Sequence, residues 1–215
     1  RSLILVAWLY LSMAIFALAL SPVLLFGHQA SMVVVRMWAA FVRFGLRWIC
    51  GVRIEVRGLE HRPTGPALIA GKHQAMLDVI VPFTFLDDPC YVMKKELMVL
   101  PFFGWFAGRT KMIAVDRAAH SAALKGMVRQ ARQRHAEGRQ ILIFPEGTRK
   151  LPGDAPDYKP GIAALYRDLD SPCVPMASNA GQHWPAHGFR RTPGTVVYEF
   201  LPAIPPGLKR GEFMA

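Results

Sequence analysis

The sequence predicts an α/β fold, with a mixed sheet flanked by helices and an N-terminal two-helix membrane-anchoring motif in front of it. Two observations predict this arrangement. Short apolar runs of strand length recur from residue 52 onward, and a segment rich in Ala, Arg and Gln separates two of them. The first 50 residues, in contrast, are mostly apolar over helical lengths. We therefore expect a membrane-associated two-helix motif at 1–50 and an α/β domain at 51–215.

The first helix is expected over residues 3–20, a run interrupted only by Ser12 and followed by further uncharged residues up to position 26. A helix needs about 20 apolar residues to span a bilayer, so the length suffices, and both a spanning and a re-entrant helix remain open. A secretory signal peptide is disfavoured, because the run is too long and no small-x-small cleavage site follows it. Pro22 is expected to break or bend this helix.

A second helix is expected over residues 32–50, after a short turn at 27–31. Its three arginines, Arg36, Arg43 and Arg47, fall within about 40° of one another on a helical wheel. An arginine stripe on an otherwise apolar helix is typical of a helix that lies among lipid headgroups. The alternative is an ordinary surface helix packed against its own domain.

The α/β domain is expected to contain strands at 52–57, 67–70, 113–115, 141–144, 174–177 and 195–200. The first of these alternates apolar and charged residues, as a half-buried strand does, and the others are apolar runs. A helix is expected over 118–137, closed by Gly138, and loops over 151–161 and 202–211. In such folds the loops after the strands carry the chemistry.

Composition narrows the class of protein. The 215 residues are 52% hydrophobic, with 26 Lys+Arg against 15 Asp+Glu and a net charge of +11. Disordered chains do not carry so much apolar surface, and nucleic-acid-binding domains are seldom so apolar, so we expect no nucleic-acid partner. Cys50, Cys90 and Cys173 form no CxxC pair, which favours reduced thiols facing the cytoplasm. A basic, apolar chain indicates anionic phospholipid as its partner.

His73 follows the expected strand at 67–70, and Asp78 stands five residues further on. On one continuous helix the two would point about 140° apart, so a pair requires a loop at His73. Asp78 would then accept a hydrogen bond from one ring nitrogen and leave the other as a free base. The alternative is a structural histidine. The preceding segment resembles a phosphate-binding loop only superficially, because its glycines are wrongly spaced and His follows Lys72.

The run Phe-Pro-Glu-Gly-Thr-Arg at 144–149 directly follows another buried strand. Gly147 and Thr148 free backbone N–H groups at the turn, and Arg149 offers a planar fork that matches phosphate or carboxylate. Alone, the run could be a structural turn with a surface arginine. No metal site is expected: His183 and His187 are four residues apart, but Pro185 stands between them and no Glu accompanies them.

Other candidates lie between these two motifs. Arg117 follows the expected strand at 113–115, and Lys95 belongs to a cationic segment further upstream. Phe102, Phe103 and Trp105 form an aromatic run that could be either core or a wall for an apolar substrate.

Together these motifs resemble the bacterial 1-acylglycerol-3-phosphate (lysophosphatidic acid) acyltransferases, a family of the glycerophospholipid acyltransferases. The matching blocks are His73-Gln74-x-x-x-Asp78 (the HX4D motif), Val115-Asp116-Arg117, residues 144–149 and Val174-Pro175. They stand in the family's order, and the resemblance extends to residues 158–161 and to the N-terminal helices. The sequence departs from the family at Lys72, Ala75, Lys111 and Lys150, which leaves acceptor selectivity open.

The resemblance implies that residues 51–215 form an acyltransferase domain of phospholipid biosynthesis. It would move a fatty acyl group from acyl-CoA or acyl carrier protein to the sn-2 hydroxyl of 1-acylglycerol-3-phosphate and make phosphatidic acid. No cofactor beyond this cosubstrate is implied. The implied location is the cell inner membrane, with the active site facing the cytoplasm. The sequence starts at Arg1 and stops at position 215, so we expect a trimmed or partial chain.

By the same resemblance, His73 is the general base, Asp78 orients it, and no covalent acyl-enzyme forms. Arg149, Arg117 and Lys95 are expected to bind the phosphate of the acceptor. Glu146, Gly147 and Thr148 support the loop, with Glu146 bracing it or Arg149, and backbone N–H groups of 145–148 are expected to stabilise the oxyanion. Phe102, Phe103 and Trp105, or the N-terminal helices, are expected to form the wall for the acyl chain.

Three alternatives remain open. The acceptor could be another lysolipid, such as lyso-ornithine lipid, with the same catalytic pair. The chain could be a hydrolase in which His73 activates water on a lipid ester or thioester. A membrane-binding module without catalysis would explain residues 1–50 but not the spacing of His73 and Asp78.

Overall fold

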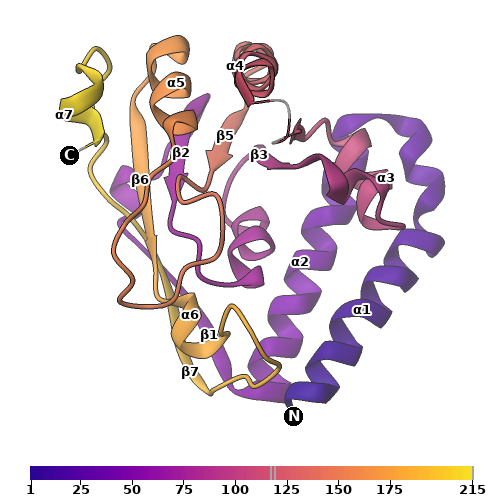
Figure 1. Cartoon of the computed structure of the whole chain (residues 1–215). Helices are drawn as coiled ribbons and strands as arrows, with labels where there is room; N and C mark the ends of the chain where they lie inside the picture. The colour runs from indigo at the N-terminus through magenta and orange to yellow at the C-terminus, as the bar shows by residue number, and fades with distance from the viewer. Residues whose placement is uncertain (117, 119, 215) are drawn as a thin grey trace.

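The structure is a computed structural model that describes residues 1–116, 118 and 120–214. Two helices, α1 (Ser2–Ala19) and α2 (His28–Cys50), lie side by side along one flank (Figure 1). Both expected helices are confirmed. The expected turn at 27–31 is wrong, because α2 begins at His28, directly after Gly27, whose φ of 95° suits glycine. Pro22 lies in the 3-10 helix η1 (Ser21–Phe26) that follows α1.

Within the described residues, seven strands form one mixed sheet in the order β1-β7-β6-β2-β5-β3-β4. Their bounds are β1 (Val52–Arg57), β2 (Ala67–Gly71), β3 (Pro89–Lys94), β4 (Ile113–Val115), β5 (Gln140–Ile143), β6 (Cys173–Ser178) and β7 (Gly194–Phe200). The central pairs are parallel, whereas β7 runs antiparallel to β6 and parallel to β1. The mixed α/β sheet is therefore confirmed. Every strand expected from the sequence lies within one residue of its expected bounds.

Helices cover both faces of this sheet (Figure 1). On one face lie α4 (His120–Ala136) and α5 (Pro160–Leu169), and on the other lie α2 and the short 3-10 helices η3 (Met76–Val79) and η4 (Val81–Thr84). The remaining short elements are η2 (Leu59–His61), η5 (Lys95–Val99), α3 (Phe103–Arg109), α6 (Ala180–His183) and α7 (Arg210–Met214). The sequence analysis did not predict β3, α3, α5, α6 or α7, and α7 begins at Arg210, inside the expected loop at 202–211. Pro160 concealed α5, since a proline in the first helical turn also reads as part of a loop.

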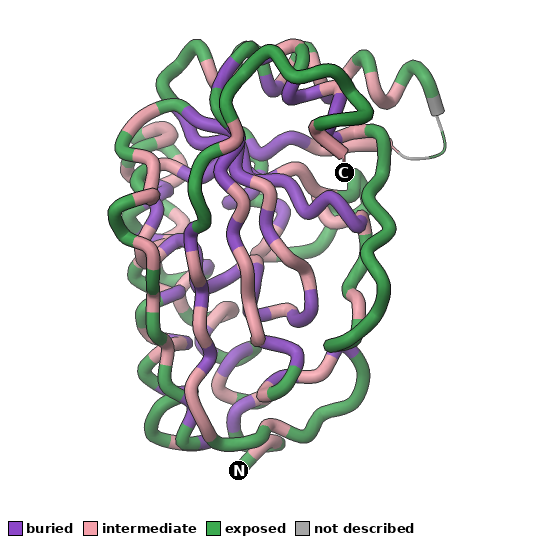
Figure 2. The backbone as a smooth tube through the Cα atoms, turned by 90° about the vertical axis from the view of Figure 1, so that its left-hand side faces the viewer, coloured by how far each residue is buried: buried purple, intermediate pink, exposed green. Residues whose placement is uncertain are grey.

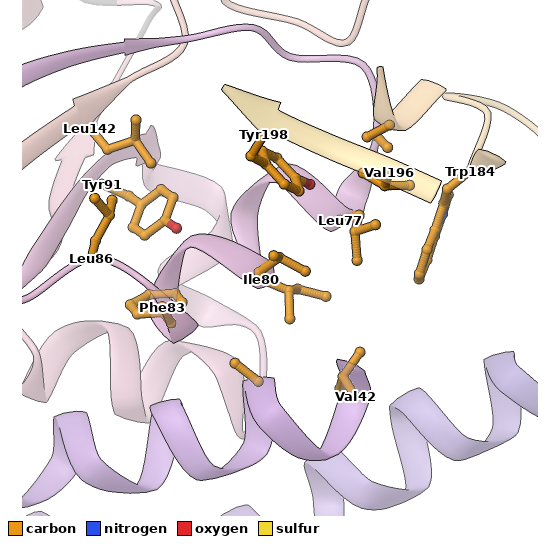
Figure 3. Packing of buried hydrophobic residues seen from close by; sticks show 14 of the residues in the cluster. Val42, Leu77, Ile80, Phe83, Leu86, Tyr91, Leu142, Trp184, Val196 and Tyr198 are labelled. Atoms are coloured by element: carbon orange, nitrogen blue, oxygen red, sulfur yellow. The ribbon is translucent and has the colours of Figure 1, made fainter. Parts of the chain in front are cut away.

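A continuous core joins the N-terminal helices to the sheet. Leu9 of α1 and Leu46 of α2 belong to the same buried cluster as Ile69 and Leu142 of the sheet. In Figure 3, side chains of the η3–η4 segment fill the space between α2 and the sheet. Buried residues gather along the central strands and exposed residues along the outer segments (Figure 2). Residues 1–50 are therefore packed on the α/β part rather than extended away from it.

The arginine stripe of α2 faces the domain for most of its length. Arg36 donates to the Leu86 carbonyl at 3.4 Å, and Arg43 donates to the Thr84 hydroxyl at 3.3 Å. Arg47 is exposed, with its guanidinium 5.5 Å from the centre of the Trp48 ring. Two of the three arginines therefore follow the alternative of a helix packed against its own domain, because η4 and the residues just after it supply oxygen acceptors along this face.

Among the described residues, one helix, α1, is long and apolar enough to cross a bilayer, judged by length and composition alone. Much of its surface is exposed, and so are parts of η1 and α2. The exposed apolar side chains on these three elements are Leu3, Ile4, Tyr10, Leu11, Ile15, Leu18, Leu25, Phe26, Val33, Met37, Phe44 and Trp48. An apolar face of this extent on a packed helix pair is unusual for a protein in water alone.

Candidate active site

His73 stands in a loop at the carboxyl end of β2. The Lys72 N–H donates to the Met176 carbonyl at 2.9 Å, which continues the β2–β6 pairing by one residue before the chain leaves the sheet. At Gly71 an added Cβ would lie only 3.1 Å from the ring of Phe144, so glycine admits this ring at the strand end. The loop that a His73–Asp78 pair requires is therefore present.

The His73 ring is held on two sides. Its Nδ1 lies 3.2 Å from Asp78 Oδ2, and its face stacks on Phe144 with ring centres 4.2 Å apart and an interplanar angle of 19°. With the Asp78 carboxylate as acceptor, Nδ1 carries the proton and Nε2 keeps a lone pair. The ring also lines the large cavity described below. The geometry therefore provides a fixed imidazole whose second nitrogen is free to act as a base.

Asp78 is fully buried and accepts hydrogen bonds on both oxygens. Besides His73, Oδ2 accepts the backbone N–H groups of Gln74 at 2.6 Å and Ala75 at 2.7 Å. Oδ1 accepts the hydroxyls of Ser178 at 3.3 Å and Tyr198 at 3.1 Å. Burial and the negative charge of Asp78 raise the pKa of Tyr198 well above its usual value, so its hydroxyl stays a proton donor. The carboxylate is thus fixed in place by four groups besides the histidine.

The loop at 144–150 is tied to the backbone of His73. The buried Glu146 accepts the His73 N–H at 3.3 Å and pairs with Lys72 Nζ, and the Lys150 N–H donates to the His73 carbonyl at 2.9 Å. Gly147 turns the loop with a φ of 67°, a left-handed conformation that glycine adopts freely. Both motifs of the sequence therefore meet at the carboxyl ends of the adjacent strands β2 and β5.

Not every backbone N–H of this loop can face an oxyanion. Pro145 has none, and the Gly147 N–H donates to the Phe144 carbonyl at 2.9 Å to close the turn. Among the hydrogen bonds of the described residues, the N–H groups of Glu146 and Thr148 are not used. Only these two residues of 145–148 are therefore candidates for oxyanion donors.

A cavity of about 1030 Å³ extends from this site toward the N-terminal helices. His73 and residues 146–149 line it at one end, and Phe16 of α1, Trp38 of α2 and the aromatic pair Phe102 and Phe103 line it elsewhere. Lining of this kind suits a long alkyl chain, and the volume is at the upper end of ordinary ligand sites. The His73 side chain is therefore part of the lining of a large cavity with mostly apolar walls.

Arg149 is exposed and lines the cavity. Lys95 does not line it: its side chain is exposed and lies 3.4 Å from Asp116. Lys94, which the sequence analysis did not choose, lines the cavity instead, because β3 ends there and the next residue turns outward into η5. Arg117 lies outside the described residues.

Trp105 does not form part of the cavity wall, contrary to expectation. It is 46% exposed and meets Phe102 edge to face at 5.3 Å between ring centres. The reason is the direction of α3, whose inner face carries the buried Phe106. Phe102 and Phe103 do line the cavity.

Comparison with known proteins agrees with this geometry. The acyltransferase family model matches residues 53–179. The chain is 39% identical over 171 residues to the 1-acyl-sn-glycerol-3-phosphate acyltransferase of Pseudomonas aeruginosa, a match that covers 80% of this chain and 66% of that protein. It is 30% identical over 165 residues to the mouse 1-acyl-sn-glycerol-3-phosphate acyltransferase alpha, covering 74% of this chain and 57% of that protein.

The chain therefore spans less than two thirds of the length of these two curated relatives. Among solved structures, the 1-acyl-sn-glycerophosphate (LPA) acyltransferase PlsC of Thermotoga maritima has the same fold, with a TM-score of 0.77 at 19% identity. That match covers 100% of this chain and 90% of the other. With the family model matched over more than half of its length, this chain belongs to the acyltransferase family.

Proposed function

We propose that this protein transfers a fatty acyl group from an acyl thioester to the sn-2 hydroxyl of 1-acylglycerol-3-phosphate, which makes phosphatidic acid. One observation carries the proposal: the His73–Asp78 pair, 3.2 Å apart, opens onto a large apolar cavity beside the exposed Arg149. The names of the Pseudomonas aeruginosa and mouse relatives contain the same acceptor, 1-acyl-sn-glycerol-3-phosphate. This reaction needs space for a fatty chain, a base for the acceptor hydroxyl and a cation for the acceptor phosphate close to one another.

In the proposed reaction His73 acts as a general base. Its Nε2 takes the proton of the acceptor hydroxyl while the oxygen bonds to the thioester carbonyl carbon, and Asp78 stabilises the imidazolium that forms. When the C–S bond breaks, the imidazolium returns the proton to the departing thiolate. The acyl group is passed directly, so no residue of the chain forms a covalent intermediate.

Negative charge develops on the carbonyl oxygen during this attack. The backbone N–H groups of Glu146 and Thr148 are the proposed donors, since Pro145 has no N–H and the Gly147 N–H already donates to the Phe144 carbonyl. The buried Glu146 side chain serves the loop rather than the reaction. Its hydrogen bond to the His73 N–H keeps the donors and the base in one rigid unit.

The phosphate of the acceptor is proposed to bind Arg149, with Lys94 nearby on the cavity lining. A guanidinium binds phosphate through two parallel hydrogen bonds and therefore also orients it. Arg117 remains a predicted ligand. Lys95 is reassigned, because its partner is Asp116 and it lies outside the cavity.

We also propose that the N-terminal helices lie in the plane of a membrane surface rather than across it. The Arg191 N–H donates to the Ser2 hydroxyl at 2.8 Å, and Arg109 donates to the Leu25 carbonyl at 3.3 Å. The α/β part therefore holds the segment of α1 and η1 near both of its ends, which supports an interfacial helix with its exposed apolar side in the lipid. The cytoplasmic face of the inner membrane is the proposed side, because acyl-CoA and acyl carrier protein are cytoplasmic.

Purified protein in detergent tests the reaction. Labelled acyl-CoA and acyl carrier protein are offered with 1-acylglycerol-3-phosphate, lyso-ornithine lipid and no acceptor, and labelled products are separated. We expect phosphatidic acid as the main product, at a rate that depends on 1-acylglycerol-3-phosphate. Faster acylation of lyso-ornithine lipid would move the proposal to that acceptor. Release of free fatty acid in the absence of an acceptor would indicate a hydrolase. No turnover with any acceptor would indicate a binding module without catalysis.

Arg149→Ala tests the phosphate contact separately. We expect KM for 1-acylglycerol-3-phosphate to rise about tenfold or more, with KM for the acyl donor nearly unchanged, because a charge-assisted contact contributes about 1.5–3 kcal/mol. Arg57→Ala, which removes an exposed arginine paired with Glu55 on the far strand β1, is the matched control. Equal changes in the KM values for the acceptor and for the acyl donor would show that Arg149 does not bind the phosphate.

A further inference from the structure

The segment that contains η5 and α3 has an exposed apolar side that its own fold does not use. Val99 is 82% exposed, Leu100 46% and Trp105 46%. Three large apolar side chains within seven residues, all exposed to this extent, are more than the single apolar residues that are scattered over most protein surfaces. We name Val99, Leu100 and Trp105 the outer face of this segment.

The inner side of the same segment belongs to the cavity. Leu97, Phe102 and Phe103 line it, and Phe106 packs with Ala17 of α1 and Val34 of α2 in a buried cluster. One short stretch of chain therefore carries cavity wall on one side and exposed apolar surface on the other. Whatever covers the outer face lies directly against the wall of the cavity.

The outer face adjoins the exposed apolar surface of the N-terminal helices. Arg109 at the end of α3 donates to the Leu25 carbonyl of η1, and Leu25 and Phe26 are 81% and 77% exposed. Figure 1 shows α3 beside the ends of α1 and α2 that η1 connects. The two apolar surfaces are thus neighbours in space although about 75 residues separate them in the sequence.

The charges around the outer face favour an anionic partner. Lys94, Lys95 and Arg109 are exposed and flank it, against the exposed Glu96 and the carboxylate of Asp116, which pairs with Lys95. Basic side chains around an apolar centre with a tryptophan match the interface of an anionic bilayer, where tryptophan is enriched and Lys and Arg meet headgroups.

We propose that the outer face inserts into the interfacial layer of anionic phospholipid as a second membrane contact beside the N-terminal helices. The inference rests on the membrane association proposed above. It adds a function for the contact: the bilayer touches the segment that forms the cavity wall, so a lysolipid passes from the membrane into the cavity along Leu97 and Phe103 without crossing water. It also accounts for Trp105, which lies outside the cavity.

Site-specific labelling can test this contact on the full chain. Cys50, Cys90 and Cys173 are all buried, and burial raises the pKa of Cys90 to about 11 and of Cys173 to about 12, so native thiols react poorly. A maleimide dye sensitive to polarity therefore labels an introduced cysteine selectively. Three variants are labelled: Val99→Cys on the outer face, Leu11→Cys on α1, and Leu59→Cys, 58% exposed at the opposite edge of the sheet.

Each labelled variant is mixed with vesicles of phosphatidylglycerol and phosphatidylcholine that contain brominated acyl chains. We expect a blue shift and quenching for Val99→Cys and Leu11→Cys, and neither for Leu59→Cys. A response at Leu11→Cys without one at Val99→Cys overturns the second contact and leaves membrane association standing. A response at neither position overturns both proposals, and an equal response at all three shows unspecific adsorption, which also overturns the second contact.

Kinetics test the consequence for the substrate. Val99→Asp is expected to raise KM about tenfold for 1-acylglycerol-3-phosphate embedded in vesicles, but not for a short-chain analogue dissolved as monomers. Leu59→Asp is the matched control and should change neither value. An unchanged KM for the embedded substrate in Val99→Asp contradicts a role of this contact in substrate entry.

Discussion

Two His–Asp pairs occur among the described residues, and of the two only the His73–Asp78 pair has its histidine on the lining of the 1030 Å³ cavity. His73 Nδ1 lies 3.2 Å from Asp78, and His28 Nε2 lies 3.0 Å from Asp88. Both histidine side chains are 16% exposed. The two pairs are therefore alike in distance and in the exposure of the histidine, although Asp78 is fully buried and Asp88 is 21% exposed.

The surroundings of the two pairs differ. Asp88 also lies 3.3 Å from the buried Arg139, and His28 Nδ1 is buried without a hydrogen-bond partner in the described part of the chain. This pair connects the first turn of α2 to the starts of β3 and β5. His73, in contrast, lines the large cavity. The difference teaches that a His–Asp pair alone does not identify a base, and the position of His73 on the cavity lining is what supports its proposed role.

His73→Ala should produce the largest effect on activity. We expect kcat to fall by about 10²–10⁴-fold, because general-base help of this kind is lost, while the unfolding temperature changes little. His28→Ala is the matched variant: it removes the histidine of the other pair and should keep kcat within a few-fold. For both variants, kcat is measured with acyl-CoA and 1-acylglycerol-3-phosphate, and the unfolding temperature is measured in detergent. Similar losses of kcat in both variants would refute the comparison.

Arg139→Met should produce the largest effect on stability. It leaves Asp88 without its buried cation, and the carbonyls of Thr110 and Pro89 lose charged donors at 3.0 and 3.1 Å. Breaking a buried pair on one side costs about 3 kcal/mol or more. Urea unfolding measures the loss, and kcat of the protein that remains folded should be close to normal. A stability within about 0.5 kcal/mol of the parent chain contradicts this account.

The difference between the two pairs also explains what the sequence could predict. His73 and Asp78 lie five residues apart, so local spacing and the preceding strand suffice to connect them. His28 and Asp88 are 60 residues apart, and Tyr198 is 120 residues from the carboxylate it binds. No local pattern marks such contacts, because the packing of β7 and α2 on the rest of the fold creates them.

The same reasoning applies to the fold and the rim of the cavity. Strands with clear apolar runs were predictable, whereas β3, which starts with Pro89 and ends at Lys94, was not. Which of two adjacent lysines lines the cavity depends on where that strand ends. Lys95 and Trp105 were therefore chosen from composition alone, and the direction of η5 and α3 places both outside the cavity.

Tyr198→Phe tests the contacts on the side of the Asp78 carboxylate that faces away from His73. Loss of the hydroxyl at 3.1 Å leaves Asp78 freer to rotate, and we expect kcat to fall about tenfold at unchanged KM, the equivalent of about 1.4 kcal/mol. Because Ser178 donates to the same oxygen, the double variant with Ser178→Ala should lose more activity than the product of the single losses.

Tyr166→Phe is the control for Tyr198→Phe. It also removes a buried tyrosine hydroxyl, which donates to the Pro205 carbonyl on the other face of the sheet. Both variants should lose comparable stability, but only Tyr198→Phe should lose kcat. A normal kcat in Tyr198→Phe would show that the remaining contacts hold Asp78 without it.

His135 offers the smallest and most specific test, because it is a part-buried histidine without a carboxylate partner among the described residues. Burial lowers its pKa below the usual 6.5, and its Nε2 is buried without a hydrogen-bond partner in the described chain. The unfolded chain then binds this proton more readily than the folded chain. The folded state is therefore unaffected well above pH 6.5 and loses stability as pH falls through about 6.5. Urea midpoints at pH 7.5 and 5.5 should differ less in His135→Gln than in the parent chain. An equal difference between the two urea midpoints in His135→Gln and in the parent chain would show that burying this imidazole does not destabilise the fold at low pH. His135 would then not differ from His73 and His28, which have carboxylate partners, in the way described.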